Sequence, residues 1–273
     1  MSSVLKLRSD VPEKFPEPEL RGDTITADRY TSADYMRREF EKVWLKTWYL
    51  GGLAYHAPEP GDWINCEFGR ESVLLVRQPD GSFRAFFNAC PHRGAAVVDG
   101  ADGHSPFFMC PYHGWKFDLA GTVTEVPSPH DYPQGNPCGK LGLKELKCQE
   151  RFGFVWFNAD PNAASLEEFL GEQIVADLAS YRIENMVRVL NMTAEADCNW
   201  KTITDNFNES YHVQIVHKEL APYIEADGDR CQYDTFPGGH NRGWFPAFRP
   251  ASFFEGDEPV EPLISMMKAW DLD

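Results

Sequence analysis

The first apolar residues at regular spacing predict a helix, and short β-like runs follow it. Thr31 and Ser32 can cap this helix, whose apolar positions recur every three or four residues at Tyr35, Met36, Phe40, Val43 and Trp44. After Trp48 the runs become short, rich in β-branched and aromatic residues, and separated by turn residues. The runs are 63–68, 72–77, 83–88, 107–109, 115–118 and 152–157. They predict an antiparallel β domain that closes near Asp160.

Helices and β-like stretches alternate after that point. Ser165, followed by Glu167 and Glu168, predicts the capped start of a helix that runs to about residue 180. Residues 188–196 form a β-like stretch, and a further helix begins near Asn199. We therefore predict an α+β protein with three parts: an N-terminal segment and helix over 1–46, an antiparallel β domain over 47–160, and a domain of helices and antiparallel sheet over 161–273.

The charge of the chain excludes some classes of partner. Its 42 acidic and 26 basic side chains leave a formal net charge of −16, which repels phosphate backbones and anionic lipid headgroups. No apolar run approaches the roughly 18 residues that a membrane helix needs. The first residues also lack the apolar core of a signal peptide. We expect a cytoplasmic protein that binds neither nucleic acid nor membranes.

The seven cysteines are spread along the chain and are odd in number. In a chain without a secretory signal this favours reduced thiols over disulfides. Cys90 and Cys110 belong to a metal-binding pattern. The other five are expected to be reduced, partly buried side chains: Cys66, Cys138, Cys148, Cys198 and Cys231.

Two loops each supply one cysteine and one histidine. The first reads CPHRG from Cys90 and contains His92, and the second reads CPYHGW from Cys110 and contains His113. A Rieske centre needs two thiolates on one iron and two imidazoles on the other, so the four side chains have the right chemistry. A structural zinc site is the alternative, but zinc sites usually pair Cys with Cys and His with His along the sequence.

This pattern resembles the Rieske domain of ring-hydroxylating, Rieske-type non-haem iron oxygenases. The likeness lies in Cys90-x-His92, the intervening residues 93–109 and Cys110-x-x-His113. It implies a Rieske [2Fe–2S] cluster in the 47–160 domain, held by these four side chains.

A second pair of candidate metal ligands, His212 and His217, lies in the helix that begins near Asn199. At about 100° per residue the two side chains diverge on a regular helix. A bend or break near residues 213–216 is therefore needed for both to reach one metal. Without further support, a pair at this spacing is more often structural or incidental than metal-binding.

Carboxylates and an amide provide that support. On a continuous helix Asp205, Glu209 and His212 share one face, and an acid facing a histidine suits the orientation of a metal ligand. Asn206 lies nearly in line with His217, which would place an amide beside the same site. The alternative for the two acids is a solvated helix face.

The same segment resembles the mononuclear-iron helix of Rieske oxygenases. The matching positions are Asp205, Asn206, Phe207, Glu209, Tyr211, His212 and His217. The resemblance implies that the two histidines and a distant carboxylate bind Fe(II). It also implies that Glu209 bridges to a cluster histidine of a neighbouring subunit in a trimer. Many members that act on aromatic rings carry Asp at this position, whereas Glu is similar to members acting on quaternary amines.

The third iron ligand has no match in this sequence. In the family it is an Asp well over a hundred residues after the histidine pair, farther along than this sequence extends. Asp234, Asp257, Asp271 and Asp273 are nominal substitutes, and none stands in a matching context. We therefore expect that the catalytic domain, which begins at residue 161 and runs to residue 273 here, lacks its C-terminal part.

The resemblance implies the terminal oxygenase component of a multicomponent system. Such a component activates O₂ at a mononuclear Fe(II) and hydroxylates or oxidatively demethylates a small organic substrate, for which we predict an aromatic compound. The sequence has no G-x-G-x-x-G fingerprint, so NAD(P)H would act through a separate reductase, with or without a ferredoxin. A homotrimer, alone or with a beta subunit, is the implied assembly. The alternative is a Rieske electron-transfer protein with a degenerate catalytic domain.

Overall fold

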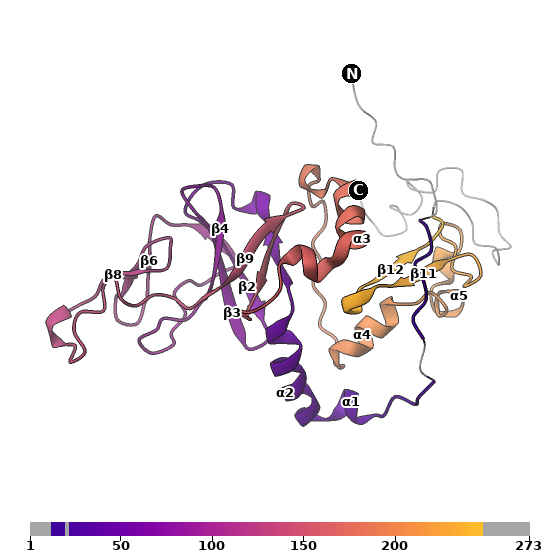
Figure 1. The fold of residues 1–273 in the computed structure, drawn as a ribbon, viewed down its shortest axis with the longest axis horizontal. Coiled ribbons are helices and arrows are strands. Elements are labelled where there is room, and N and C mark those ends of the chain that lie inside the picture. The colour runs from indigo at the N-terminus through magenta and orange to yellow at the C-terminus, as the bar shows by residue number, and fades with distance from the viewer. Residues whose placement is uncertain (1–11, 20–21, 248–273) are drawn as a thin grey trace, which may run out of the picture. The chain divides into compact units, whose positions relative to one another are not determined.

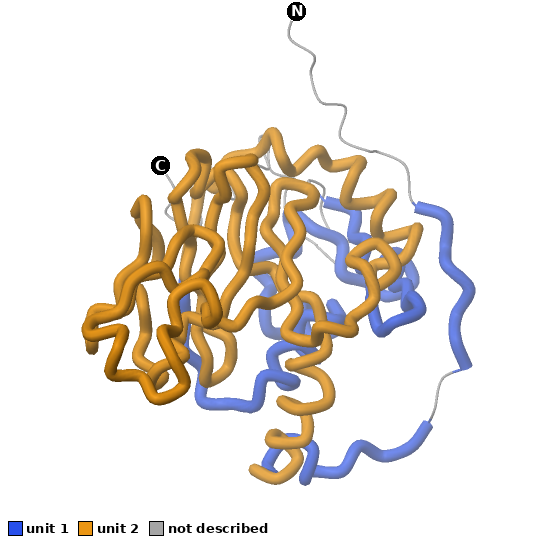
Figure 2. Tube along the Cα trace, turned by 60° about the vertical axis from the view of Figure 1, so that its left-hand side comes forward, with its two compact units in different colours: residues 1–32, 193–273 blue, residues 33–192 orange. Residues whose placement is uncertain are grey.

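A computed structural model describes residues 12–19 and 22–247, which form two compact units (Figure 2). The β unit comprises residues 33–192, and the helix–hairpin unit combines residues 1–32 with 193–273. Residues 161–192, which the sequence pattern assigns to the second domain, group with the β unit. The domain boundaries at residues 46 and 160 stay predictions.

A seven-stranded antiparallel sheet forms the frame of the β unit (Figure 1). The strand order is β1-β10-β9-β4-β3-β2-β5. The strands are β1 (Tyr49–Leu53), β2 (Asp62–Phe68), β3 (Glu71–Arg77), β4 (Phe83–Phe87), β5 (Asp102–His104), β9 (Glu145–Arg151) and β10 (Phe154–Asn158).

Strand β3 is buried on both faces, which explains its unbroken apolar run. Because side chains alternate along a strand, Leu74 and Val76 enter one core while Val73 and Leu75 enter another. Each of these four side chains is fully buried. Strand β3 therefore holds two hydrophobic layers together.

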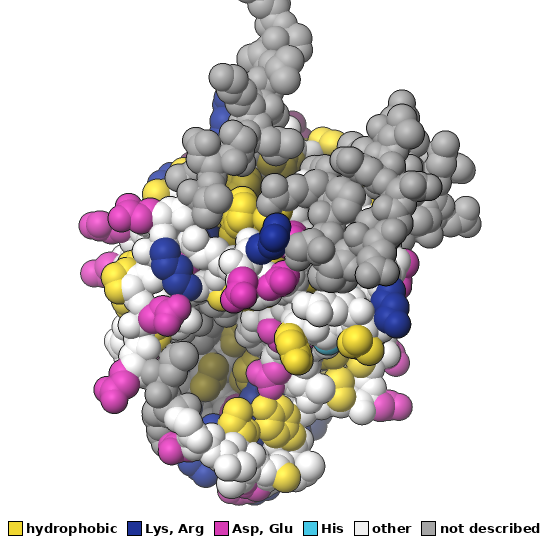
Figure 3. All heavy atoms as spheres, turned by 90° about the vertical axis from the view of Figure 1, so that its right-hand side faces the viewer, with side chains coloured by type: hydrophobic (Ala, Val, Ile, Leu, Met, Phe, Trp, Pro, Cys, Tyr) yellow, Lys and Arg dark blue, Asp and Glu magenta, His cyan; other side chains and the backbone are white. Residues whose placement is uncertain are grey.

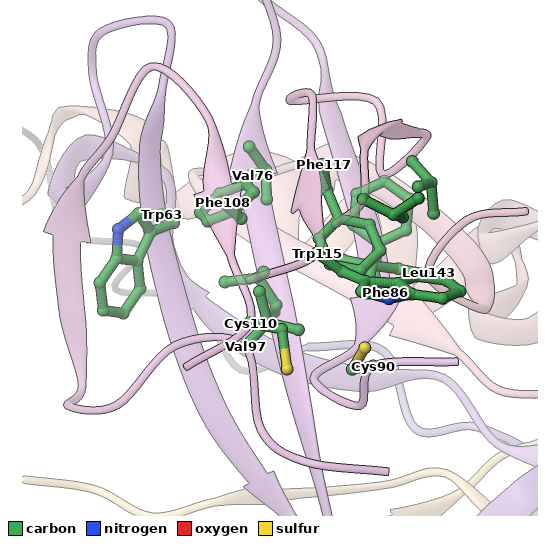
Figure 4. Close-up of a cluster of buried hydrophobic side chains, with 13 residues drawn as sticks. Trp63, Val76, Phe86, Cys90, Val97, Phe108, Cys110, Trp115, Phe117 and Leu143 are labelled. Carbon is green, nitrogen blue, oxygen red and sulfur yellow. The ribbon is translucent and has the colours of Figure 1, made fainter. Parts of the chain in front are cut away.

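The first of these cores lies under a smaller sheet. This three-stranded sheet has the order β6-β7-β8, formed by β6 (Phe108–Met109), β7 (Lys116–Phe117) and β8 (Val123–Glu125). Phe117, Phe108 and Trp115 pack with β3 and β4 side chains, and Figure 4 shows Cys90 and Cys110 at one edge of this cluster. The two cysteine loops lie between β4 and β5 and between β6 and β7, so one core supports both loops.

Two longer helices complete the β unit. Helix α2 (Ala33–Lys42) is the helix predicted after Thr31 and Ser32, and α3 (Leu166–Tyr181) is the one predicted after Ser165. Ser165 and Glu168 form a capping box at the start of α3. Leu166 and Leu170 pack with Trp48 in a third core.

The helix–hairpin unit is built from short elements. Helices α1 (Asp28–Thr31), α4 (Trp200–Phe207) and α5 (Val213–Val216) accompany a hairpin of β11 (Gln232–Thr235) and β12 (Asn241–Trp244). The N-terminal residues 12–15 lie against this hairpin: Gln232 donates to the Pro12 carbonyl, and the Phe15 N–H donates to Asp234.

The α+β fold class and the main β-like runs are confirmed. Residues 188–196 are a correction, because they form no strand in the described structure. No described strand pairs with them, and an unpaired strand leaves its backbone groups unsatisfied. Strand β9 went unpredicted because its side chains are mostly polar, with Leu146 its buried residue. Among the described helices, none is long and apolar enough to cross a membrane.

Candidate metal centres

The two cysteine loops share one hydrogen-bond framework. In the first loop the N–H of Cys90 donates to the Ala95 carbonyl at 2.8 Å, and the N–H of Gly94 donates to the Cys90 carbonyl at 2.9 Å. In the second loop the N–H of Cys110 donates to the Trp115 carbonyl at 2.8 Å, and the N–H of Gly114 donates to the Cys110 carbonyl at 3.0 Å. The same turn therefore presents both cysteines, although the histidine lies one position later in the second loop.

Each of these turns needs a glycine. Gly94 has φ of 76° and Gly114 has φ of 71°, a region that side-chain-bearing residues rarely adopt. A β-carbon at Gly94 would meet nothing within 4 Å. The requirement at Gly94 is therefore set by backbone conformation and not by crowding.

Asn88 fixes the first loop to the sheet. Its side-chain oxygen accepts from the N–H groups of Val97 and Val98 at 2.8 and 3.0 Å. Its side-chain nitrogen donates to the Val98 carbonyl and to the Ser72 hydroxyl. A buried amide that meets both its donor and acceptor demands holds the end of the loop in one place.

The two thiols are buried side by side. Cys90 and Cys110 are 3% and 2% exposed, and both are free of disulfides. Burial raises the pKa of the Cys90 thiol, and the neighbouring Cys110 side chain adds to this rise. Two adjacent soft ligands suit one iron of a cluster.

The two histidines of these loops also lie together. Their ring centroids are 4.6 Å apart, and the ring of His92 stacks on Trp115 at 5.1 Å with an interplanar angle of 2°. Nδ1 of His113 is buried, and no described residue gives it a hydrogen-bond partner. A buried ring nitrogen in this position fits a metal ligand, so the loops fit a Rieske cluster with two thiolates and two imidazoles.

The second motif departs from the continuous helix that the sequence suggests. Helix α4 begins next to Asn199 as predicted, and Asn199 caps it by accepting from the N–H of Lys201 at 3.1 Å. The helix ends at Phe207, a turn follows over residues 208–212, and α5 starts at Val213. The break therefore precedes the predicted position at 213–216, and it removes the common helix face expected for Asp205, Glu209 and His212.

The break brings the two histidines together. The ring centroids of His212 and His217 are 5.4 Å apart. Glu209 contacts Nδ1 of His212 with one carboxylate oxygen and accepts from the His212 backbone N–H at 3.1 Å with the other. Burial opposes ionisation of Glu209, but these hydrogen bonds outweigh it and hold the pKa of Glu209 below its ordinary value.

Glu219 has the corresponding place beside the second histidine and was missed from the sequence. One of its oxygens lies 3.4 Å from Nδ1 of His217. Carboxylates on both Nδ1 atoms leave the two Nε2 atoms for a metal. An acid two positions after a candidate ligand is the only sequence signal for this contact.

His212, His217 and Glu209 line a cavity of about 300 Å³. Asn206 also lines it, as predicted for an amide beside the site. Most of the remaining lining is apolar: Phe207, Val213, Leu220, Ile224, Ala226 and Phe245.

Asp205 is not part of this lining. Its carboxylate accepts instead from the Tyr30 hydroxyl at 2.7 Å. The end of α4 at Phe207 directs the later residues away from the helical path, and this explains why Asp205 and Glu209 have different neighbours.

Asp234 is fully engaged elsewhere and cannot serve as the third iron ligand. Its side chain is 0% exposed and accepts from Arg242, Gln232 and the Phe15 N–H. The other nominal substitutes, Asp257, Asp271 and Asp273, lie outside the described residues. Within residues 12–19 and 22–247, no three His, Cys, Asp or Glu side chains converge on one ion position.

The comparisons with known proteins identify the family. A profile for the Rieske [2Fe-2S] domain matches residues 47–146, and one for the ring hydroxylating alpha subunit catalytic domain matches residues 183–272. The chain therefore belongs to the family of Rieske oxygenase alpha subunits, whose two domains use a [2Fe–2S] cluster and a mononuclear iron.

Particular relatives include enzymes for different substrates. The chain is 30% identical to the carnitine monooxygenase oxygenase subunit of Escherichia coli strain K12, over 80% of this chain and 58% of the relative. It is 32% identical to the benzene 1,2-dioxygenase subunit alpha of Pseudomonas putida, over 79% of this chain and 51% of the relative. The chain thus spans just over half the length of these relatives.

A solved structure of a Rieske monooxygenase also matches the fold of this chain. The quaternary ammonium Rieske monooxygenase CntA, in complex with an inhibitor, superposes with a TM-score of 0.72 at 27% identity. The match covers 81% of this chain and 61% of that one.

Proposed function

We propose that this chain acts as the oxygenase component of a multicomponent Rieske system. One observation carries the proposal: two histidines and a carboxylate line the same apolar cavity, in a chain that also has a separate pair of Cys–His loops. The first set suits a mononuclear Fe(II) and the second suits a [2Fe–2S] cluster.

The side chains have distinct roles in this proposal. Cys90, Cys110, His92 and His113 hold the cluster. His212 and His217 hold Fe(II) through Nε2, while Glu209 orients His212 and carries the electronic connection to the cluster. When bound, the metals supply electron transfer and O₂ activation, and the protein positions the substrate and limits access.

The substrate and partners follow as further proposals. The apolar lining suits a small organic molecule, and its aromatic residues Phe207 and Phe245 favour an aromatic ring. Electrons come from NAD(P)H through a reductase, with or without a ferredoxin. A homotrimer, with or without a beta subunit, and a cytoplasmic location complete the proposal.

Metal content and oxygen uptake test this function. The purified chain, loaded with iron and sulfide anaerobically, is expected to hold the two irons of the cluster and a further ferrous iron. With a reductase and NADH, it should take up O₂ when an aromatic ring such as benzene is added. Carnitine, a quaternary amine, is tested in parallel. O₂ uptake with carnitine and not with benzene would show that the substrate is a quaternary amine and not an aromatic compound.

The same experiment separates the alternative function. A Rieske electron carrier would show the visible absorption of the cluster, no further ferrous iron and no substrate-dependent O₂ uptake. That result would overturn the oxygenase proposal.

A further inference from the structure

The turn between α4 and α5 carries both Glu209 and His212, so whatever fixes this turn also fixes these two groups. Ser210 lies between them and is 5% exposed. Its carbonyl accepts from the N–H of Val213 at 3.0 Å, which joins the turn to the start of α5. Ser210 lines the same cavity as Glu209 and His212.

The Ser210 hydroxyl contacts two oxygen atoms, in addition to the Cys231 thiol. It donates to the Ala226 carbonyl at 3.1 Å and contacts the Tyr233 hydroxyl. A serine has one hydroxyl hydrogen, and a carbonyl can only accept. The bond to Ala226 therefore uses that hydrogen, and Tyr233 is the donor in the contact between the two hydroxyls.

Tyr233 is itself held firmly. It belongs to β11, where it pairs with Gly243 of β12, and its ring meets that of Phe245 at 5.5 Å. Its carbonyl also accepts from the Lys14 ammonium group. The hydroxyl pair therefore connects a turn without regular structure to a strand with several anchors.

We infer that Ser210 and Tyr233 are positioning residues for the mononuclear iron site. Their hydroxyl pair sets the path of the turn and so keeps the Glu209 carboxylate on the His212 ring. This inference rests on the proposed Fe(II) site at His212 and His217. It goes beyond that site because the two hydroxyls bond to each other and to the Ala226 carbonyl, and not to the rings of His212 and His217.

The test compares Ser210→Ala and Tyr233→Phe with the unaltered chain, each loaded with its cluster and ferrous iron. The readout is the rate at which a colorimetric ferrous chelator removes iron from the anaerobic protein. Loss of an orienting interaction commonly lowers metal affinity by 10- to 100-fold, so we expect release to become at least about tenfold faster. The double variant should release iron no faster than the faster single variant, because the two hydroxyls act as one pair.

Controls separate positioning from general loss of structure. Tyr223→Phe removes a hydroxyl from the same unit outside the pair and should leave the release rate unchanged. Ser210→Thr retains the hydroxyl and should release iron as slowly as the unaltered chain. Cluster absorbance per chain, which reports on the other unit, should be equal in all variants.

Two outcomes overturn the inference in different ways. If the unaltered chain holds ferrous iron and both single variants release it at the unaltered rate, the positioning role is wrong and the iron site stands. This includes the case in which the variants only lower the melting temperature. If the unaltered chain holds no ferrous iron beyond its cluster, the proposed function fails and the positioning role fails with it.

Discussion

The two histidines of the Cys–His loops differ in their surroundings although their loops share one turn. His92 is exposed and stacks on Trp115, whereas His113 has a buried Nδ1 without a described partner. The single extra residue before His113 accounts for the difference, because it shifts the imidazole along an otherwise equal turn. At the residue scale, the two ligand positions are similar in chemistry and unequal in exposure.

Replacing His92 by Cys tests its role as a ligand. The cluster should still form, and its reduction potential should fall by roughly 200 mV or more, because a thiolate donates more charge to iron than an imidazole. Protein-film voltammetry measures the change. His104→Cys provides the control, since His104 is exposed in the same unit and pairs with Asp62 outside the loops. An unchanged potential in His92→Cys would show that His92 is not a ligand.

At the element scale, the N-terminal segment and the β11–β12 hairpin form one hydrogen-bonded assembly. Arg242 donates to the Asp234 carboxylate at 2.6 Å and to the Glu13 carbonyl at 3.1 Å. The rings of Phe15 and Phe236 approach to 4.8 Å. Since β11 also carries Tyr233, this assembly supports the strand on which the iron-site turn rests.

Asp234 should make the stability of this assembly depend on pH. Burial raises its pKa, but hydrogen bonds from Gln232, Arg242 and the Phe15 N–H outweigh burial and hold the pKa below its ordinary value. The stabilisation of the folded state by the ionised Asp234 carboxylate is therefore complete above the unfolded pKa of about 4. It is lost as pH falls through the lower pKa that Asp234 has in the folded state.

Asp234→Asn should remove this pH dependence and lower the free energy of unfolding at pH 7 by about 3 kcal/mol, because the largely buried Arg242 loses its ion pair with the Asp234 carboxylate. Urea unfolding between pH 7 and pH 3 measures both effects. Asp229→Asn, an exposed acid in the same unit, should behave like the unaltered chain. If Asp234→Asn loses stability with acid as steeply as the unaltered chain does, Asp234 is not the group responsible.

On the scale of the whole molecule, each candidate centre takes its residues from one compact unit. The Cys–His loops belong to the β unit, and both His212 and His217 belong to the helix–hairpin unit. We therefore expect that each centre can be lost without the other, and the proposed oxygenase reaction would need both. Figure 3 shows acidic side chains spread over one face of the molecule, in keeping with the net charge of −16.

Glu209→Gln tests the proposed connection between the centres. An amide can still hydrogen-bond to His212, so both metals should remain bound at unaltered amounts. Oxidation of the reduced cluster by O₂ in the presence of substrate should slow by at least about tenfold, because the negative charge at the connection is lost. Stopped-flow absorbance of the cluster follows this step. Glu195→Gln, an exposed acid before α4, is the matched control, and rapid oxidation in Glu209→Gln would contradict the bridging role.

Sequence patterns predicted the elements whose signals are local. The helix cap at Ser165, the strand runs around β2, β3 and β4, and the paired Cys–His loops all depend on residue types at short spacing. Strand β9 escaped prediction because its place in the sheet depends on partners on both sides, and its own residues are mostly polar. Residues 188–196 have a β-like pattern but lack such a partner among the described strands.

The sequence by itself determined which side chains are candidate iron ligands, and that these candidates fall into two separate sets. Only the tertiary structure decided which of these side chains meet. The end of α4 at Phe207 separates Asp205 from Glu209, and the buried bonds to Asp234 remove it from the candidate ligands. Ligand identity is a property of single residues, whereas their convergence depends on helix ends and buried hydrogen bonds formed by residues distant in the sequence.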